Sequence, residues 1–261
     1  MPNLPTATFN SYDLASVVPG LKIISTNPYR QADRKLSFSD VANANKGVTT
    51  SSYNKSKKLN LIVEISQNTR ELLDDAIDAL KKYVLPREKL LVLSQGSGTR
   101  QWTASYSNMS FSDVYGGHAT VDIEFIAADG VGVDVASTNL FSTSLTGANS
   151  NTPFVGQVGG TMEWQQPIIT ITLTAVSGGT GGTMIIGNPD NGMQATITGN
   201  FATGDVIVLD SRTKKVTLNG GEISYQGSVP EWALGAGSID YVDNFTTRTR
   251  TMSGLYYKRY A

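Results

Sequence analysis

The sequence predicts a mainly β protein made of two β-sandwich domains, the first with one flanking α-helix. Three observations predict it. Charged residues make up only 16% of the 261 residues, against roughly a quarter in typical globular chains, and Ser, Thr, Asn and Gly replace them. Apolar residues alternate with polar ones in many short segments, which is the period of a half-buried strand. One segment alone has helical spacing, and no helical pattern follows residue 85.

Strands in the first half of the chain are indicated by this alternation. The clearest is Leu59 to Ile65, in which every second residue is Leu, Val or Ile. Residues 39–57 are rich in Ser, Asn and Lys, which is typical of a long loop or an extended hairpin. The expected strands of this half are 21–23, 34–38, 59–65, 90–93, 102–106 and 121–125.

A single amphipathic helix is expected over residues 69–83. Asn68 is the expected N-cap, because Glu71 follows three residues later as in a capping box. Two lysines fall in the last turn, where the helix dipole favours cations, and Pro86 prevents continuation. The apolar face consists of Leu72, Leu73, Ala76, Ile77 and Leu80.

The second half of the chain carries strand patterns alone. Apolar periodicity fades over residues 130–160, so the domain junction is expected there, with domains of 1–135 and 136–261. Asn219-Gly220 is a strong hairpin-turn signal. Short strands with turn signals at spacings of about 8–12 residues indicate a β-sandwich. The expected strands are 169–173, 193–197, 206–209, 215–218 and 223–225.

Enzymatic and metal chemistry are not expected. The chain has no cysteine, which excludes disulfides, thiolate zinc sites and cysteine nucleophiles. His118 is the only histidine, and it follows two glycines at a strand start, which is typical of a turn or surface position. The glycine run 178–182 lacks the Lys-Ser or Lys-Thr and the following helix of a phosphate loop, so it is expected to be a hairpin tip. The sequence therefore indicates no catalytic, cofactor-binding or metal-binding residue.

Two Glu–Trp neighbours keep a carbohydrate-binding module open as an alternative. Glu163 precedes Trp164, and Glu231 precedes Trp232. A tryptophan beside a carboxylate can stack on a sugar, and paired carboxylates can hydrolyse one when their separation in space is suitable. The more ordinary interpretation places each tryptophan in a core or an interface and each glutamate in solvent.

Charge and hydropathy limit the partners and the location. The net charge is −1, and the densest basic run is Lys55, Lys57 and Lys58, so a dedicated nucleic-acid-binding protein is not expected. No apolar run reaches the roughly 20 residues that span a membrane, and no signal-peptide pattern opens the sequence. Synthesis and assembly in the cytoplasm are therefore expected.

Several motifs share their order and spacing with a known family. The run GDVIVLD at 204–210 is followed by KKVTLNG at 214–220. Pro230 then precedes a glycine-rich stretch at 235–237, and the aromatic and basic run YKRY occupies 257–260. In this order the sequence resembles the distal tail proteins of siphophages over nearly its whole length.

The resemblance implies a specific architecture and role. Domain 1–135 would be tail-tube-like and ring-forming, and domain 136–261 would be a galectin-like sandwich. Six copies would form a ring at the tail tip of the virion, joining the tail tube protein to the tail-associated hub protein. DNA would pass through the ring without specific binding. With 261 residues there is no room for an inserted carbohydrate-binding module, so direct receptor binding is not expected.

The polar segment 39–57 is the expected oligomer interface. It is long enough to reach a neighbouring copy, and Val41, Val48 and Tyr53 are interspersed in it as apolar contacts. Two alternatives remain beside the tail-tip ring: a tail-tube or tail-terminator subunit, and a carbohydrate-binding β-sandwich module. An enzyme is not expected.

Overall fold

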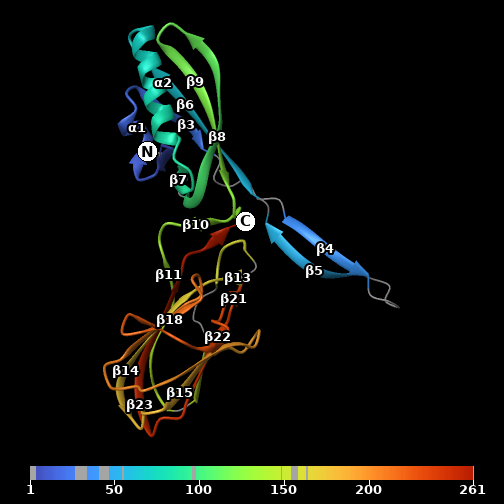
Figure 1. Ribbon diagram of the computed structural model, residues 1–261, viewed down its shortest axis with the longest axis vertical. Helices are drawn as coiled ribbons and strands as arrows, with labels where there is room; N and C mark the ends of the chain where they lie inside the picture. Colours follow the sequence, from blue (N-terminus) through green and yellow to red (C-terminus); the bar gives the residue numbers. More distant parts are fainter. Residues whose placement is uncertain are drawn as a thin grey trace. The chain divides into compact units, whose positions relative to one another are not determined.

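The chain folds into two compact units, each with its own hydrophobic core. The computed structural model describes residues 4–26, 34–40, 47–54, 56–95, 98–147, 149–153, 158–162 and 164–260 (Figure 1). Unit 1 comprises Met1–Val135 and Tyr260–Ala261, and unit 2 comprises Ala136–Arg259. Strands predominate in both units, so the predicted mainly β fold is confirmed.

Unit 1 is built on an antiparallel sheet of nine strands. Its hydrogen-bonded path runs β2-β1-β7-β8-β9-β6-β3, and β10 pairs with both β8 and β24. The strands are β1 (Thr6–Phe9), β2 (Tyr12–Asp13), β3 (Leu21–Thr26), β6 (Lys57–Ser66), β7 (Lys89–Gln95), β8 (Gly98–Tyr115), β9 (His118–Ala127), β10 (Gly132–Asp134) and β24 (Arg259–Tyr260).

Alternation of side chains explains the two central strands, β6 and β9. In both strands every second residue is buried, and the strands pair from Lys57↔Ala127 to Ser66↔His118. Because successive side chains point to opposite faces of a sheet, one face supplies the core and the other carries polar residues. Lys58 and Glu124 form an ion pair on the polar face, with Nζ and Oε2 3.0 Å apart.

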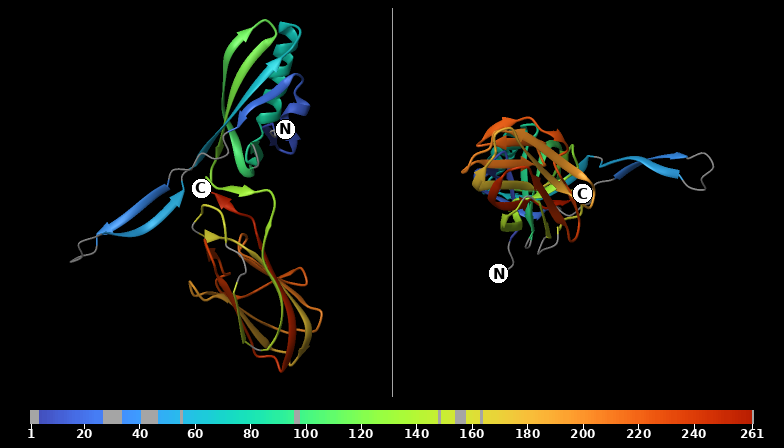
Figure 2. Two further views of the ribbon diagram at one scale, coloured as in Figure 1. Left: turned by 180° about the vertical axis from the view of Figure 1, so that it is seen from behind. Right: turned by 90° about the horizontal axis from the view of Figure 1, so that it is seen from below.

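Helix α2 (Arg70–Val84) packs against β6 and β9 (Figures 1 and 2). The predicted N-cap, Asn68, is wrong. Thr69 caps the helix, and its hydroxyl accepts a hydrogen bond from the amide of Leu72 at 3.3 Å. The amide of Gln67 donates to the carbonyl of Gly117 (2.7 Å), which holds the chain extended and places the cap one residue later. Glu71 therefore stands at the second helical position, not at the third position that a capping box needs.

A second, short helix, α1 (Leu14–Val17), was not predicted. The side chain of Asp13 caps it by accepting a hydrogen bond from the amide of Ala15 (3.3 Å), and Leu14 is buried. Four residues are too few to show a helical period, so the sequence pattern could not reveal this helix. Neither helix found in the described residues has the length and apolar character needed to cross a membrane.

In the sequence, the chain between β3 and β6 forms a separate two-stranded sheet. Strands β4 (Arg34–Asp40) and β5 (Gly47–Asn54) pair antiparallel, with an irregularity between Ser37 and Phe38. In the described part of the chain, β4 and β5 pair with each other and with no other strand. Of the two interpretations that the sequence left open for this region, the extended hairpin is the one observed. We call β4 and β5 together the arm.

Unit 2 contains one six-stranded and one five-stranded antiparallel sheet. The six-stranded sheet has the order β11 (Thr138–Thr146), β23 (Thr247–Tyr256), β14 (Ile168–Ser177), β17 (Val206–Asp210), β18 (Lys215–Leu218) and β19 (Gly221–Ile223). The five-stranded sheet has the order β12 (Asn149–Pro153), β22 (Ser238–Asp243), β15 (Gly182–Asn188), β16 (Met193–Gly199) and β20 (Gln226–Gly227). Strands β13 (Trp164–Gln165) and β21 (Trp232–Ala233) form a small sheet of their own.

Both larger sheets contribute to a single core. Ile171 of β14 and Ile186 of β15 are fully buried in the same cluster, as in a sandwich. Asn219 and Gly220 form the expected turn between β18 and β19, with φ angles of 51° and 84° in the left-handed region that such a hairpin turn requires. The glycine run 178–182 connects β14 to β15, which lie in different sheets, so the predicted hairpin tip is wrong there.

Candidate functional site

Strand β8 extends beyond the strand that pairs with it on one side. β7 pairs with β8 from Gln95↔Gly98 to Lys89↔Ala104 and then ends. Within the described strands, the remaining eleven residues of β8, Ser105–Tyr115, pair with β9 alone. Their other side therefore has none of the described strands beside it. We call this segment the β8 edge.

The β8 edge lacks most of the features that protect an exposed edge. Open edges invite pairing with another chain, and proteins usually prevent it with Lys, Pro, bulges or very short strands. The segment contains no Lys, Arg or Pro, and Asp113 is its only charged residue. Two irregularities interrupt its pairing with β9, but residues 108–112 between them keep a regular register. The exposed large apolar side chains of the edge are Phe111, Val114 and Tyr115.

Two hollows adjoin the β8 edge and share Tyr106. The first has a volume of about 430 Å³ and opens where β7 leaves β8. The second has a volume of about 270 Å³ and lies between the end of α2 and β8, with Leu85, Met109 and Phe111 in its lining. A free strand edge beside pockets for side chains is the arrangement by which a sheet accepts an added strand.

Lys57 is an unusual residue at the start of β6, close to the arm in sequence. It is 1% exposed, and its Nζ has no hydrogen-bond partner among the described residues. The amine lies 5.5 Å from the centroid of the Trp102 ring. Burial and the nearby charge of Arg100 lower the pKa of Lys57 from 10.5 to about 8.

The structure gives the expected interface residues only a backbone position. Val48 and Tyr53 lie on β5, where they are paired with Ser39 and Lys35 of β4. Val41 lies outside the described residues. Their role at an interface stays a prediction.

His118 lies at a polar cluster but without the geometry of a serine triad. The hydroxyl of Ser66 and the carboxylate of Glu64 both contact its Nδ1, at 3.0 and 3.4 Å. In a triad the two partners use different ring nitrogens, so that a proton taken from the serine is balanced by the acid on the other side. The contacts among these three residues therefore do not form a proton relay. Within the described residues, no group of three or more His, Asp or Glu side chains is placed to hold a metal ion.

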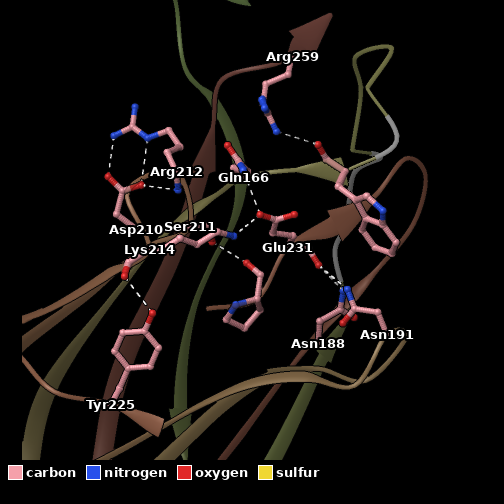
Figure 3. A network of polar contacts seen from close by, with 12 residues as sticks. Gln166, Asn188, Asn191, Asp210, Ser211, Arg212, Lys214, Tyr225, Glu231 and Arg259 are labelled. Atoms are coloured by element: carbon pink, nitrogen blue, oxygen red, sulfur yellow. Dashed lines mark hydrogen bonds and ion pairs between the residues drawn. The ribbon is translucent and has the colours of Figure 1, made fainter. Parts of the chain in front are cut away.

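In unit 2, a network of polar contacts centres on Glu231 (Figure 3). Its carboxylate accepts a hydrogen bond from Gln166 Nε2 (3.0 Å) and forms an ion pair with Lys214. Its backbone carbonyl accepts hydrogen bonds from the side-chain amides of Asn188 (2.7 Å) and Asn191 (2.9 Å). These contacts tie the segment before β21 to both larger sheets, so Glu231 has a structural explanation.

A second ion pair belongs to the same region. Arg212 contacts Asp210 through two nitrogens, with Nη2–Oδ2 and Nε–Oδ1 distances of 2.9 and 3.1 Å (Figure 3). Burial alone would raise the pKa of Asp210, but the hydrogen bonds and the charge of Arg212 outweigh it and lower the pKa. Asp210 is therefore ionised at neutral pH and acts as a fixed partner of the arginine.

The tryptophans proposed for sugar stacking do not form an open platform. Trp232 is 1% exposed, and its Nε1 donates a hydrogen bond to the carbonyl of Ser238 at 2.8 Å. A ring that is buried in the core has no face left for a sugar. Trp164 is half-buried, and Glu163 lies outside the described residues. The ordinary interpretation, a tryptophan packed in the core, holds for Trp232.

Sequence reasoning missed the features that stand out most in unit 1. The expected strand 102–106 is the middle of an 18-residue strand. Residues 107–115 are mostly exposed and polar, so apolar alternation gave no signal there. The hollow beside Glu88 brings together residues from three distant stretches of the chain, which no local pattern reveals.

Comparisons with known proteins identify the fold. No protein-family model matches the chain, and no curated protein matches it. Among solved structures, the chain is similar to the Dit protein (gp 19.1) of phage SPP1, with 12% identity, 99% of this chain and 100% of that chain covered, and a TM-score of 0.71. That protein is described as a paradigm of the hub adsorption apparatus in phages that infect Gram-positive bacteria.

A weaker likeness links the chain to the phage P2 baseplate in its activated conformation. The structures with Ca and with Sr are each 9% identical over 98% of both chains, with TM-scores of 0.46 and 0.43. The chain has the fold of the SPP1 Dit protein. The resemblance to distal tail proteins that the sequence indicated is therefore confirmed as a likeness of fold over 99% of the chain.

Proposed function

We propose that this chain is a structural subunit of a phage tail tip. Six copies form a ring that joins the last ring of the tail tube to the hub proteins and leaves a channel for DNA. Unit 1 is the ring-forming, tail-tube-like domain, and unit 2 is a galectin-like sandwich. The observation that carries the proposal is the match to the SPP1 Dit protein, a hub adsorption protein, over the full length of both chains.

The β8 edge supports ring formation on physical grounds. A closed cyclic ring repeats one contact between two different surfaces of the subunit. The path β8-β9-β6-β3 is antiparallel throughout. At one end the β8 edge pairs with β9 alone, and at the other β3 forms its strand ladder with β6 alone among the described strands, although the hydroxyl of its last residue, Thr26, donates to the carbonyl of Ser94 in β7. Pairing β3 of one copy with the β8 edge of the next continues the same antiparallel sheet. Each copy then covers one open edge of its neighbour.

The arm supplies the second expected contact. An isolated two-stranded hairpin is marginally stable in water, so the arm needs a surface to pack on. We assign that surface to a neighbouring copy, with Val41, Val48 and Tyr53 as contact residues. Deletion of residues 42–50 is expected to leave folded monomers that do not form rings, as measured by circular dichroism and light scattering. Normal rings from the deletion variant would contradict the role of the arm.

The charge of the chain suits passage of DNA. A protein that neutralises many phosphates binds DNA tightly and non-specifically. With a net charge of −1, a ring of this chain has no basic excess with which to retain DNA. The location that follows is the tail tip of the virion, with assembly in the host cytoplasm. The proposal assigns no enzymatic activity.

The mass of the purified full chain by light scattering, with negative-stain images of the same fractions, tests the proposal. A discrete ring of six copies with a central hole is the expected result, either alone or on addition of the tail tube and hub proteins. Long filaments would show a tail-tube subunit instead. A chain that stays monomeric at all concentrations and with those partners would contradict the proposal.

A further inference from the structure

Two buried nitrogen donors lie close together in unit 1 without a hydrogen-bond partner. They are Nζ of Lys57 on β6 and Nε1 of Trp102 on β8, and each residue is 1% exposed. Within the described part of unit 1, they are the only buried side-chain donors that lack an acceptor. A buried donor without an acceptor costs free energy, and the cost is larger for a charged group. Two such donors in one place therefore need a physical explanation.

Both side chains lie on the core face of the sheet and meet over two alanines. Lys57 is paired with Ala127 of β9, and Ala127 is paired with Ala104 of β8, two residues after Trp102. All four residues are buried, as expected for positions that project from the same face. Because the alanine methyl groups are short, the two longer side chains extend over them. Nζ of Lys57 lies 5.5 Å from the centroid of the Trp102 ring, a separation that two hydrogen bonds of about 3 Å each can span.

The indole of Trp102 is held in place by close packing. β10 passes beside the ring at Gly132, where an added Cβ atom would lie 2.8 Å from Nε1. Any other residue at position 132 would collide with the ring, so glycine lets the backbone of β10 lie directly against it. This contact confines the ring and holds the indole N–H in a fixed direction, as a preorganised binding group requires.

The charge beside the two donors is positive. Arg100 stands two residues before Trp102 on β8, and burial together with the charge of Arg100 lowers the pKa of Lys57 to about 8, so the amine is still mostly protonated at neutral pH. Asp134, the cross-strand partner of Arg100, accepts a hydrogen bond from the hydroxyl of Tyr260 (3.2 Å) and none from Lys57. A buried ammonium group and a fixed N–H donor that face each other favour an anion between them.

We propose that Lys57 and Trp102 form a binding site for a small monovalent anion such as chloride. Nζ of Lys57 supplies the positive charge, and Nε1 of Trp102 donates the second hydrogen bond. The surrounding core excludes larger and more strongly hydrated anions. The bound anion offsets the cost of burying the ammonium group and so stabilises the start of β6. The inference is independent of the proposed ring, because every contact that it uses lies within one copy of unit 1.

A chloride titration of the purified full chain tests the site. Sodium chloride replaces sodium gluconate at constant ionic strength, since gluconate is too large for a buried site. The melting temperature of the wild type is expected to rise and then to level off, by about 5 °C or more when chloride exceeds its Kd about a hundredfold. Lys57→Met is expected to abolish this rise. In gluconate Lys57→Met is expected to be more stable than the wild type, and chloride is expected to narrow the difference.

The next residue of β6 provides the matched control. Lys58 points to the opposite face of the sheet, is exposed and forms an ion pair with Glu124, so Lys58→Met is expected to keep the full chloride response. Trp102→Phe keeps an aromatic ring but removes the N–H group, and it is expected to weaken chloride binding by about tenfold. A crystal of the full chain grown in sodium bromide is expected to show an anomalous peak in contact with Lys57 Nζ and Trp102 Nε1.

Three results would each overturn the inference. They are a wild-type melting temperature that does not depend on chloride, a chloride response that Lys57→Met retains, and a bromide crystal without a peak between the two donors. A rise in melting temperature that Lys57→Met abolishes and Lys58→Met keeps, together with the bromide peak, is the result that the inference predicts. None of these measurements depends on assembly, so their failure would leave the proposed ring untouched.

Discussion

The two units treat their sheet edges differently. In unit 2, the edge strands β19 and β20 have three and two residues, β12 includes Pro153, and β11 has an irregular register near Phe141. Each of these features discourages pairing with another chain. In unit 1, the β8 edge continues for eleven residues without Lys, Arg or Pro. Most edge strands of unit 2 are thus shorter than the β8 edge or contain proline, whereas the β8 edge of unit 1 is longer, although two register irregularities also interrupt its pairing with β9.

The buried cations of the two units differ in the number of hydrogen bonds that they make. Arg250 of unit 2 is fully buried, and its two terminal nitrogens donate to the carbonyl of Gly147 (2.8 Å) and the hydroxyl of Ser150 (2.9 Å). Lys57 of unit 1 is equally buried, yet its amine has no hydrogen-bond partner among the described residues. Unit 2 also has unsatisfied buried polar atoms, since Arg250 Nε, Tyr241 OH and Asp243 Oδ2 lack a hydrogen-bond partner among the described residues. The difference between the two cations is therefore one of degree: Arg250 bonds through two of its three nitrogens, whereas the amine of Lys57 makes no hydrogen bond to a described residue.

The largest effect is expected from removal of Arg250. Arg250→Ala would leave a cavity beside the Tyr241 ring, which lies 3.5 Å from the guanidinium, and would unpair the carbonyl of Gly147. We expect a loss of about 3–4 kcal/mol of unfolding free energy, measured by urea denaturation. Arg212→Ala, which removes a partly exposed ion pair, is the control and should cost less than about 1 kcal/mol. Equal losses of unfolding free energy in the two variants would contradict the structural role assigned to Arg250.

Replacement of Lys57, in contrast, should raise the unfolding free energy at neutral pH. Burial lowers the pKa of Lys57 from 10.5 to about 8 in the folded chain. Below pH 8 the amine is charged in both states, and its burial lowers the unfolding free energy. Between pH 8 and 10.5 that penalty disappears, and stability rises relative to a chain without this group. Lys57→Met is therefore expected to be more stable than the wild type at pH 7 by about 3 kcal/mol. The difference should shrink to near zero by pH 10.5, and a pH-independent difference would contradict the account.

A charge on the β8 edge should block assembly without unfolding unit 1. Phe111 is 43% exposed, so Phe111→Lys should change the unfolding free energy by no more than about 0.5 kcal/mol. Because an edge lysine opposes strand pairing, the concentration needed for half-assembly should rise by about tenfold or more, as measured by light scattering. Val242→Lys on unit 2, at 38% exposure, is the matched control and should assemble normally.

The smallest effect concerns the corrected helix cap. Thr69→Ala removes the hydrogen bond to the amide of Leu72 and should cost about 1 kcal/mol of unfolding free energy. Asn68→Ala should cost less than about 0.5 kcal/mol, because Asn68 is not the cap. A larger loss for Asn68→Ala than for Thr69→Ala, in thermal or urea melts, would support Asn68 as the N-cap that the sequence predicted.

The sequence predicted the elements whose signal is local. β6, β9 and α2 each place apolar residues at a regular period over ten residues or more. The turn at Asn219 and Gly220 was predictable because these two residue types favour the positive φ angles that the turn requires. The order of motifs at 204–220 also indicated the fold that the SPP1 Dit likeness shows.

The candidate site could not be predicted in the same way. Whether β8 has a free edge depends on where β7 ends, and the hollow depends on residues from Glu88 to Asp129 that meet only in the folded chain. The pairing of β10 with β24 joins residues more than a hundred positions apart. Such features arise from long-range contacts, which periodicity and turn signals do not report because both are local patterns.

Amide hydrogen exchange of the assembled and the dissociated chain tests the central claim most directly. The account predicts that amides of residues 107–115 whose N–H points away from β9 exchange fast in the monomer and become protected by about tenfold or more in the ring. Amides of β14 in unit 2 should exchange at the same rate in both states. Rings in which residues 107–115 exchange as fast as in the monomer would contradict the claim that the open edge of unit 1 is closed by assembly.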